Sequence, residues 1–152
     1  MKQRVSRREW SSPRRSGRRP RLLVEDDRAA LAISDFSLFH HAGFDVAFCS
    51  GPGDDPQACP VLHGQACPLL TGTDVVLHGL DPALGIAAAI RRQYPRLPVV
   101  IEQRRDEDSS VGEAPDGCVP LRYASSVSGQ IAAVRRALAD AASQTGTDQH
   151  PE

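Results

Sequence analysis

Short apolar runs alternate along the chain with longer amphipathic stretches. The runs that have the length and composition of strands are residues 21–25 (RLLVE), 44–49 (FDVAFC), 74–78 (DVVLH), 97–102 (LPVVIE) and 117–121 (GCVPL). Strands that alternate with helices pair in parallel, and the helices cover both faces of the sheet. The pattern therefore predicts an α/β fold with a doubly wound, five-stranded parallel sheet.

Two of the four connections between these runs, and the segment after the last run, have helical spacing. Residues 28–42 carry Ala29, Leu31, Ala32, Phe36, Leu38 and Phe39; residues 82–94 carry Ile86, Ile90 and Tyr94; and the helix after Ser125 or Ser126 carries Ile131, Val134 and Leu138. The other two connections lack the spacing. Residues 51–72 contain repeated prolines and glycines, and residues 103–116 are polar, so we expect loops in both places.

Charge divides the chain into a basic leader and an acidic body. Nine of the 18 lysines and arginines lie in the first 21 residues, where Glu9 is the only acidic residue. We expect a disordered leader over residues 1–20, an ordered domain over 21–142 and a flexible tail over 143–152. Three interpretations of the leader stay open. It could be an arm that binds phosphates or an acidic surface, a solvated tail, or the product of a misassigned start codon.

The composition also indicates where in the cell the protein is located. No apolar run reaches the roughly 18 residues that a membrane helix needs, and the leader lacks the apolar core of a secretory signal. We therefore expect a cytoplasmic protein with no membrane contact. The four cysteines, Cys49, Cys59, Cys67 and Cys118, are then expected to be reduced.

Four motifs resemble the receiver (CheY-like) domain of two-component response regulators. They are LLVEDD at 22–27, DVVLHGL at 74–80, LPVVI at 97–101 and DGCVPLRY at 116–123, and the resemblance spans residues 21–140. It implies a flavodoxin-like sheet with strand order 2-1-3-4-5. It also implies that the family's second and fourth helices are here reduced or replaced by loop.

The resemblance brings an expectation about chemistry. Receivers take a phosphoryl group onto an aspartate after the third strand, while an acidic pair after the first strand holds Mg²⁺. Here Glu25 and Asp26 match the acidic pair, which implies at most a weak, vestigial Mg²⁺ site. Gly79 occupies the position of the acceptor aspartate, and Leu121 occupies the position of the lysine that contacts the phosphoryl group.

Neighbouring residues do not supply the missing groups. The Thr or Ser position falls on Glu102 or Gln103, and Lys2 is the only lysine in the chain. Asp81 could in principle accept a phosphoryl group, but Asp81-Pro82 is also a typical start of a helix. Similarly, the acidic cluster of Glu25, Asp26 and Asp27 could bind Mg²⁺ or simply cap the first helix.

The loop between the second and third strands contains a Cys-Pro pair repeated eight residues apart, at Cys59 and Cys67. Cys49 and His63 lie close to it in sequence. These residues could form a Cys₃His zinc site or a redox-sensitive pair, although zinc sites usually have tighter Cys spacing. They could equally be small apolar side chains in a core.

The sequence thus favours a phosphorylation-independent pseudo-receiver without catalytic residues or a cofactor. It would act by binding another protein, such as a regulator, a kinase or a transcription factor, in bacterial two-component signalling. The alternative is a thiol or metal sensor that uses the Cys59/Cys67 loop. Nucleic acid is a weaker candidate partner, through the basic leader, and the oligomeric state stays open.

Overall fold

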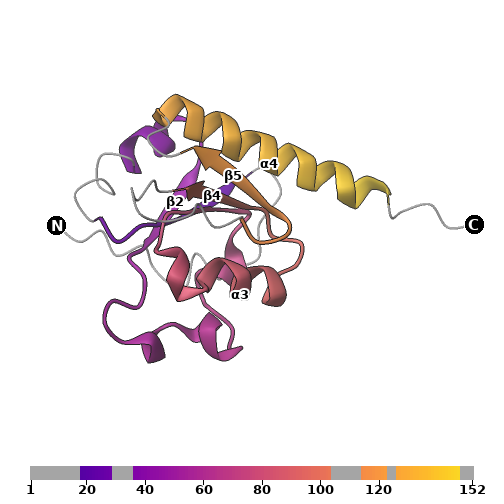
Figure 1. Ribbon diagram of the computed structural model, residues 1–152. Helices are drawn as coiled ribbons and strands as arrows, with labels where there is room; N and C mark the ends of the chain where they lie inside the picture. Colours follow the sequence, from indigo (N-terminus) through magenta and orange to yellow (C-terminus); the bar gives the residue numbers. More distant parts are fainter. Residues whose placement is uncertain (1–17, 29–35, 104–113, 123–125, 148–152) are drawn as a thin grey trace, which may run out of the picture.

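The computed structural model describes residues 18–28, 36–103, 114–122 and 126–147. Five parallel strands form one sheet in the order β2-β1-β3-β4-β5 (Figure 1). They are β1 (Arg21–Glu25), β2 (Asp45–Cys49), β3 (Val75–His78), β4 (Val99–Gln103) and β5 (Cys118–Arg122). The predicted doubly wound parallel sheet is confirmed, and the predicted strands differ from the observed ones only at their ends.

The inner strands are apolar on both faces, which is why they read as continuous apolar runs. Every residue of β1 and of β3 is buried. Leu23 and Val76 belong to the core on one side of the sheet, whereas Leu22 and Val75 belong to the core on the other side. A parallel sheet with such strands has to be covered on both faces.

One face is covered by α3 (Ile86–Gln93), in which Ile86 and Ile90 are buried as predicted. The single helix predicted over residues 82–94 is wrong. Gly85 has a φ of 70°, in the left-handed region that α-helices exclude, and it separates α3 from a 3-10 turn, η4 (Pro82–Leu84).

The same face is covered by the segment between β2 and β3, which forms three short 3-10 turns and no α-helix. They are η1 (Pro56–Ala58), η2 (Pro60–His63) and η3 (Leu70–Gly72). Prolines open η1 and η2, and Val61 and Leu70 anchor the segment in the core. The predicted loss of the second helix is therefore confirmed.

The opposite face is covered by helical residues 36–41 and by α4 (Val127–Thr147). Phe39 and Val134 are fully buried there. The rest of the predicted stripe on the last helix, Ile131 and Leu138, packs partly buried against the same core. The predicted cap at Ser126 is also present, since its Oγ accepts a hydrogen bond from the backbone N–H of Gly129 at 3.2 Å.

The helix α4 is longer than predicted and projects past the sheet (Figure 1). It continues to Thr147, so the predicted start of the tail at 143 falls inside a helix. The added residues 143–147 (SQTGT) are polar, and the hydroxyl groups of Ser143 and Thr145 donate hydrogen bonds to the carbonyl oxygens of Ala139 and Ala142 at 3.1 and 2.8 Å. Within the described ranges, neither α4 nor another helix has the length and apolarity needed to cross a membrane.

Some predictions fall on residues outside the described ranges. These are the leader up to residue 17, most of the loop predicted at 103–116 in place of the fourth helix, and Ala29, Leu31 and Ala32 of the first helix.

Candidate functional site

The carboxyl ends of β1, β3 and β4 meet at one edge of the sheet, called here the carboxyl edge. Glu25 ends β1 and pairs in register with His78, which ends β3. Asp26 and Gly79 follow these strands, and Glu102 lies near the end of β4. The edge where parallel α/β sheets bind ligands is therefore lined by carboxyl groups and one histidine.

Glu25 is held by His78. The Nδ1 atom of His78 lies 2.8 Å from Oε1 of Glu25, and the two side chains are 3% and 5% exposed. The sequence singled out Glu25 as half of a Mg²⁺-binding pair, but in the structure its carboxyl group is buried against an imidazole. Sequence reasoning treated His78 only as a strand end, although the register of β1 and β3 places it opposite Glu25.

Asp26 is held by Arg28, two residues further along the chain. The Nε and Nη2 atoms of Arg28 donate to Oδ1 and Oδ2 of Asp26 at 3.0 and 2.7 Å, so the contact is bidentate. The backbone N–H of Arg28 also donates to Oδ1, at 2.8 Å. This local turn aims the guanidinium back over the edge, and it explains why Arg28 was missed: an arginine in a polar stretch carries no signal of its own.

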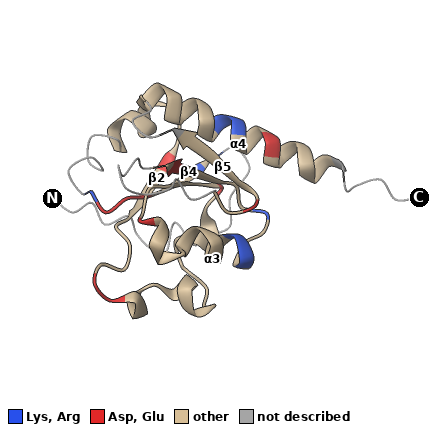
Figure 2. Cartoon of the chain, in the orientation of Figure 1, with Lys and Arg blue, Asp and Glu red and all other residues tan. Residues whose placement is uncertain are grey.

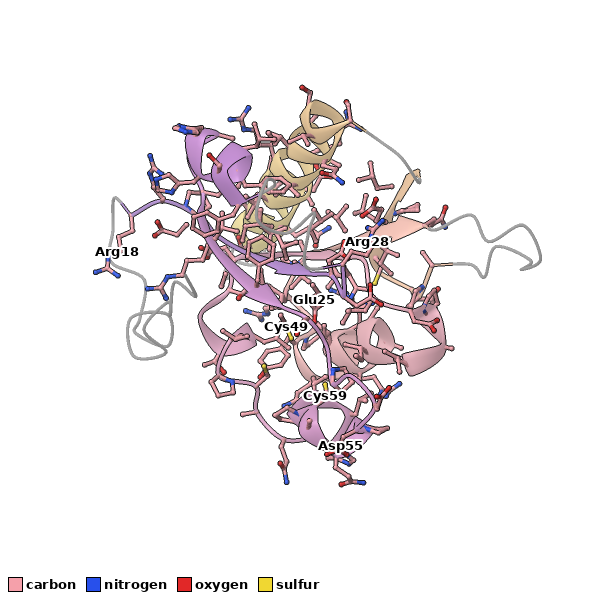
Figure 3. All side chains as sticks on the ribbon, turned by 90° about the vertical axis from the view of Figure 1, so that its left-hand side faces the viewer. Arg18, Glu25, Arg28, Cys49, Asp55 and Cys59 are labelled. Carbon is pink, nitrogen blue, oxygen red and sulfur yellow. The ribbon has the colours of Figure 1, made fainter. Side chains whose placement is uncertain are left out.

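Arg28 also reaches β4, where its Nη2 lies 3.6 Å from Oε2 of Glu102 (Figure 3). The side chains of Asp26 and Glu102 are 10% and 9% exposed, and that of Arg28 is 32% exposed. One guanidinium thus bridges carboxylates from two strands at the predicted Mg²⁺ position.

Gly79 lies between those carboxylates. A Cβ atom at this position would be 3.3 Å from Oδ2 of Asp26 and 3.4 Å from Oε2 of Glu102. The backbone N–H of Gly79 donates to the carbonyl of Glu25 at 2.7 Å. The predicted acceptor position is therefore at the centre of the acidic edge, but it presents no side chain.

The other predicted positions lie as follows. Leu121 packs partly buried against the core that contains Phe39. Asp81 caps η4, where its Oδ1 accepts a hydrogen bond from the backbone N–H of Ala83 at 2.9 Å. Asp27 is exposed, in contrast to the buried Asp26. Asp81 thus has the capping role that the sequence offered as the alternative to phosphorylation.

The four thiols lie on the α3 side of the sheet. Cys49, Cys59, Cys67 and Cys118 are free, partly buried and packed against one core. The pKa of Cys49 is raised to about 11, mainly by burial and to a smaller extent by the neighbouring Glu25, Cys67 and Cys59, while the backbone N–H of Gly51 opposes the rise. Cys49 is therefore protonated at neutral pH and is a poor nucleophile.

His63 does not join the thiols as a ligand in the described structure. It is exposed, and its Nε2 lies 3.2 Å from the carbonyl oxygen of Pro56. Across the described residues, no three His, Cys, Asp or Glu side chains are grouped so that they could hold a metal ion. Cys118, also free, lies on β5, where burial raises its pKa although Arg91 opposes the shift.

Comparison with known proteins identifies the fold. No family model matches the chain, and no curated protein matches its sequence. Solved structures of receiver domains match it over most of its length. A response regulator receiver domain from Clostridium thermocellum has a TM-score of 0.63 at 19% identity, covering 82% of this chain and 98% of that one.

Two further structures agree. The signal receiver domain of an HD domain-containing protein from Pseudomonas fluorescens has a TM-score of 0.59 at 19% identity, over 88% of this chain and 96% of that one. A response regulator receiver protein from Sinorhizobium medicae has a TM-score of 0.55 at 24% identity, over 81% and 97%. The chain therefore has the fold of receiver domains.

Proposed function

We propose that this protein is a phosphorylation-independent receiver-like module that acts by binding another protein in two-component-type signalling. The observation that carries the proposal is Gly79. It lies where the receiver resemblance calls for an acceptor aspartate, between two carboxylates that would flank such a side chain. Glycine has no atom that can take a phosphoryl group.

The surrounding groups support the same conclusion. Phosphoryl transfer needs cations and hydrogen-bond donors around the transferring group. Leu121 stands at the lysine position, and Glu102 and Gln103 offer no hydroxyl. Realignment cannot supply a lysine from β5, because Lys2 is the only lysine in the chain. A module with this edge would signal through its folded surface, whose shape does not depend on phosphorylation.

The test is incubation with Mg²⁺ and acetyl phosphate, followed by intact mass measurement. We expect no phosphoryl adduct on the wild-type protein, with an active receiver domain treated in parallel as the positive control. The variant Asp81→Asn controls for an unexpected acceptor. An adduct on the wild type that Asp81→Asn abolishes would overturn the proposal and identify Asp81 as the acceptor.

Partner binding is tested in the same conditions. A two-hybrid screen against the kinases, regulators and transcription factors of the source genome would identify the partner. We expect its dissociation constant, measured with purified proteins, to be unchanged by acetyl phosphate. A change of more than threefold with the wild type would contradict a phosphorylation-independent role.

A second candidate function is a thiol switch, favoured by the proximity of Cys59 and Cys67 to Cys49 in one core layer. Two thiols and one hydrogen peroxide molecule would give a disulfide and two water molecules. Because the pKa of Cys49 is raised to about 11, the pair expected to react is Cys59 and Cys67. The two cysteines flank η2, so a disulfide between them would constrain this turn.

The thiol switch is tested by mass spectrometry after peroxide treatment. It predicts the loss of two hydrogens from the wild type, reversed by a reductant, and no such loss from Cys59→Ser. Cys118→Ser is the control and should behave as the wild type does. Oxidation that stops at sulfenic acid, or that is equal in Cys59→Ser, would rule the switch out.

A further inference from the structure

We propose that Arg28 is a built-in counter-ion that takes the place of the divalent cation at the carboxyl edge. The edge would then carry its cation within the chain itself and would keep one structure whether or not Mg²⁺ is present. This inference rests on the proposed function, since it concerns the same edge and explains how it stays inactive.

The donor set does not fit Mg²⁺. This ion requires near-octahedral oxygen ligands at about 2.0–2.1 Å. Both carboxylate oxygens of Asp26 already accept hydrogen bonds from Arg28, at 2.7–3.0 Å. The carboxyl group of Glu25 contacts His78. A Mg²⁺ ion could reach Asp26 only by displacing a bidentate guanidinium that lies between the same oxygens.

Gly79 limits the negative charge that Arg28 has to offset. An aspartate at position 79 would put a further carboxylate within contact of Asp26 and Glu102, which are close to its Cβ position. Carboxylates at this spacing would repel one another and would favour a divalent cation. With Gly79, no carboxylate is added between Asp26 and Glu102, and Arg28 contacts both of them.

The position of Arg28 makes this counter-ion permanent. It is fixed two residues from Asp26 by a backbone hydrogen bond, so it does not have to be recruited from solution. Its planar fork matches a carboxylate in a way that lysine cannot. Its contact with Glu102 also links the loop after β1 to β4.

The test compares Arg28→Gln, which removes the charge, with Arg28→Lys, which keeps the charge without the fork. Arg92→Gln is the matched control. Arg92 is exposed in the last turn of α3, the end of the helix that leads to the amino end of β4 and thus away from the carboxyl edge. Figure 2 shows the basic residues of this turn in blue. Melting temperatures and Mn²⁺ binding by calorimetry are measured for each protein, without metal and in millimolar MgCl₂.

We expect the melting temperature of the wild type and of Arg92→Gln to be unchanged by MgCl₂. Arg28→Gln should melt about 5–10 °C lower than the wild type and recover at least half of this loss in MgCl₂. It should also bind Mn²⁺ at least tenfold more tightly than the wild type. If Arg28→Gln does not fold, Arg28→Lys should show the same changes at smaller size.

The inference is overturned if the wild type binds Mn²⁺ as tightly as the Arg28 variants, or if MgCl₂ stabilises all the proteins equally. Its failure is distinguishable from that of the proposed function. Metal binding by a wild type that forms no phosphoryl adduct would overturn only the counter-ion. A phosphoryl adduct on the wild type would overturn the proposed function, whatever the metal result.

Discussion

The interior of the sheet and its carboxyl edge differ in how their residues relate to the receiver resemblance. In the interior, β1, β3 and β4 carry the apolar residues that any doubly wound sheet needs, and buried side chains cover both faces. At the edge, Gly79 and Leu121 stand where the resemblance places the acceptor aspartate and the lysine. The same strands thus keep the fold at one end and present different chemistry at the other.

The difference lies in what each region requires. The interior requires volume and apolarity, which many residues supply, so receiver domains of 19–24% identity share its shape. The edge requires polar partners for its buried carboxyl groups. Two contacts provide them, Glu25 with His78 and Asp26 with Arg28. Changes in the interior should therefore act through packing, and changes at the edge through charge.

The largest expected effect is in the interior. Ile90 is 0% exposed, and replacing it with alanine leaves a cavity beneath the sheet. We expect Ile90→Ala to lower the free energy of unfolding by about 4 kcal/mol, with no dependence on MgCl₂. Urea unfolding measures this. A loss below about 1 kcal/mol would contradict the packing assigned to α3.

The next effect is at the buried pair. In His78→Leu the carboxyl group of Glu25 stays buried without its partner, and we expect a loss of about 3 kcal/mol. The double variant Glu25→Leu/His78→Leu removes both polar groups and should recover more than half of this loss. If the double variant is less stable than His78→Leu, the contact between Glu25 and His78 does not explain the loss of stability.

A smaller effect is expected at Gly79. Gly79→Ala should cost about 1 kcal/mol, because its Cβ would lie 3.3 Å from oxygen atoms of Asp26 and Glu25. Gly79→Asp should cost about 2 kcal/mol at pH 7, since it adds a further carboxylate. The difference between the two variants isolates charge. Equal losses in urea unfolding would mean that repulsion at the edge is negligible.

The smallest effect concerns Cys49. Its pKa is raised in the folded state from 9.0 to about 11, so folding favours the neutral thiol. This contribution is complete below pH 9 and is lost as the pH rises to about 11. This rise in pKa corresponds to at most about 2.7 kcal/mol, and solvent screening of the partly exposed thiol reduces it. The stability gap between wild type and Cys49→Ala should therefore narrow by about 1 kcal/mol over this range. A gap that stays constant or widens would contradict the raised pKa.

The apolar pattern predicted the sheet well, because strands that are buried on both faces have continuous apolar sequences. It failed at Gly85, where Pro82 and Ile86 fit one helix in the sequence and a left-handed glycine divides them in space. It also missed the length of α4, because the polar stretch 143–147 (SQTGT) has the composition of a tail.

The sequence predicted where the residues of the candidate site lie, but it did not predict which side chains contact one another. The acidic residues after β1 and the glycine after β3 were placed correctly at one edge, because parallel strands bring their carboxyl ends together. That Arg28 would fold back onto Asp26 and reach Glu102 depends on a turn conformation and a distance between strands. Neither is visible in a single sequence.

Both proposals require that the carboxyl edge has one structure and does not respond to a phosphoryl group. The most direct test is the ¹H–¹⁵N NMR spectrum of the wild type, recorded alone and with Mg²⁺ and beryllofluoride, an analogue of the phosphoryl group. We expect two superimposable spectra. Shifts concentrated at Asp26, Gly79 and Glu102 would contradict this expectation, because they would show an edge that still binds the cation and the analogue.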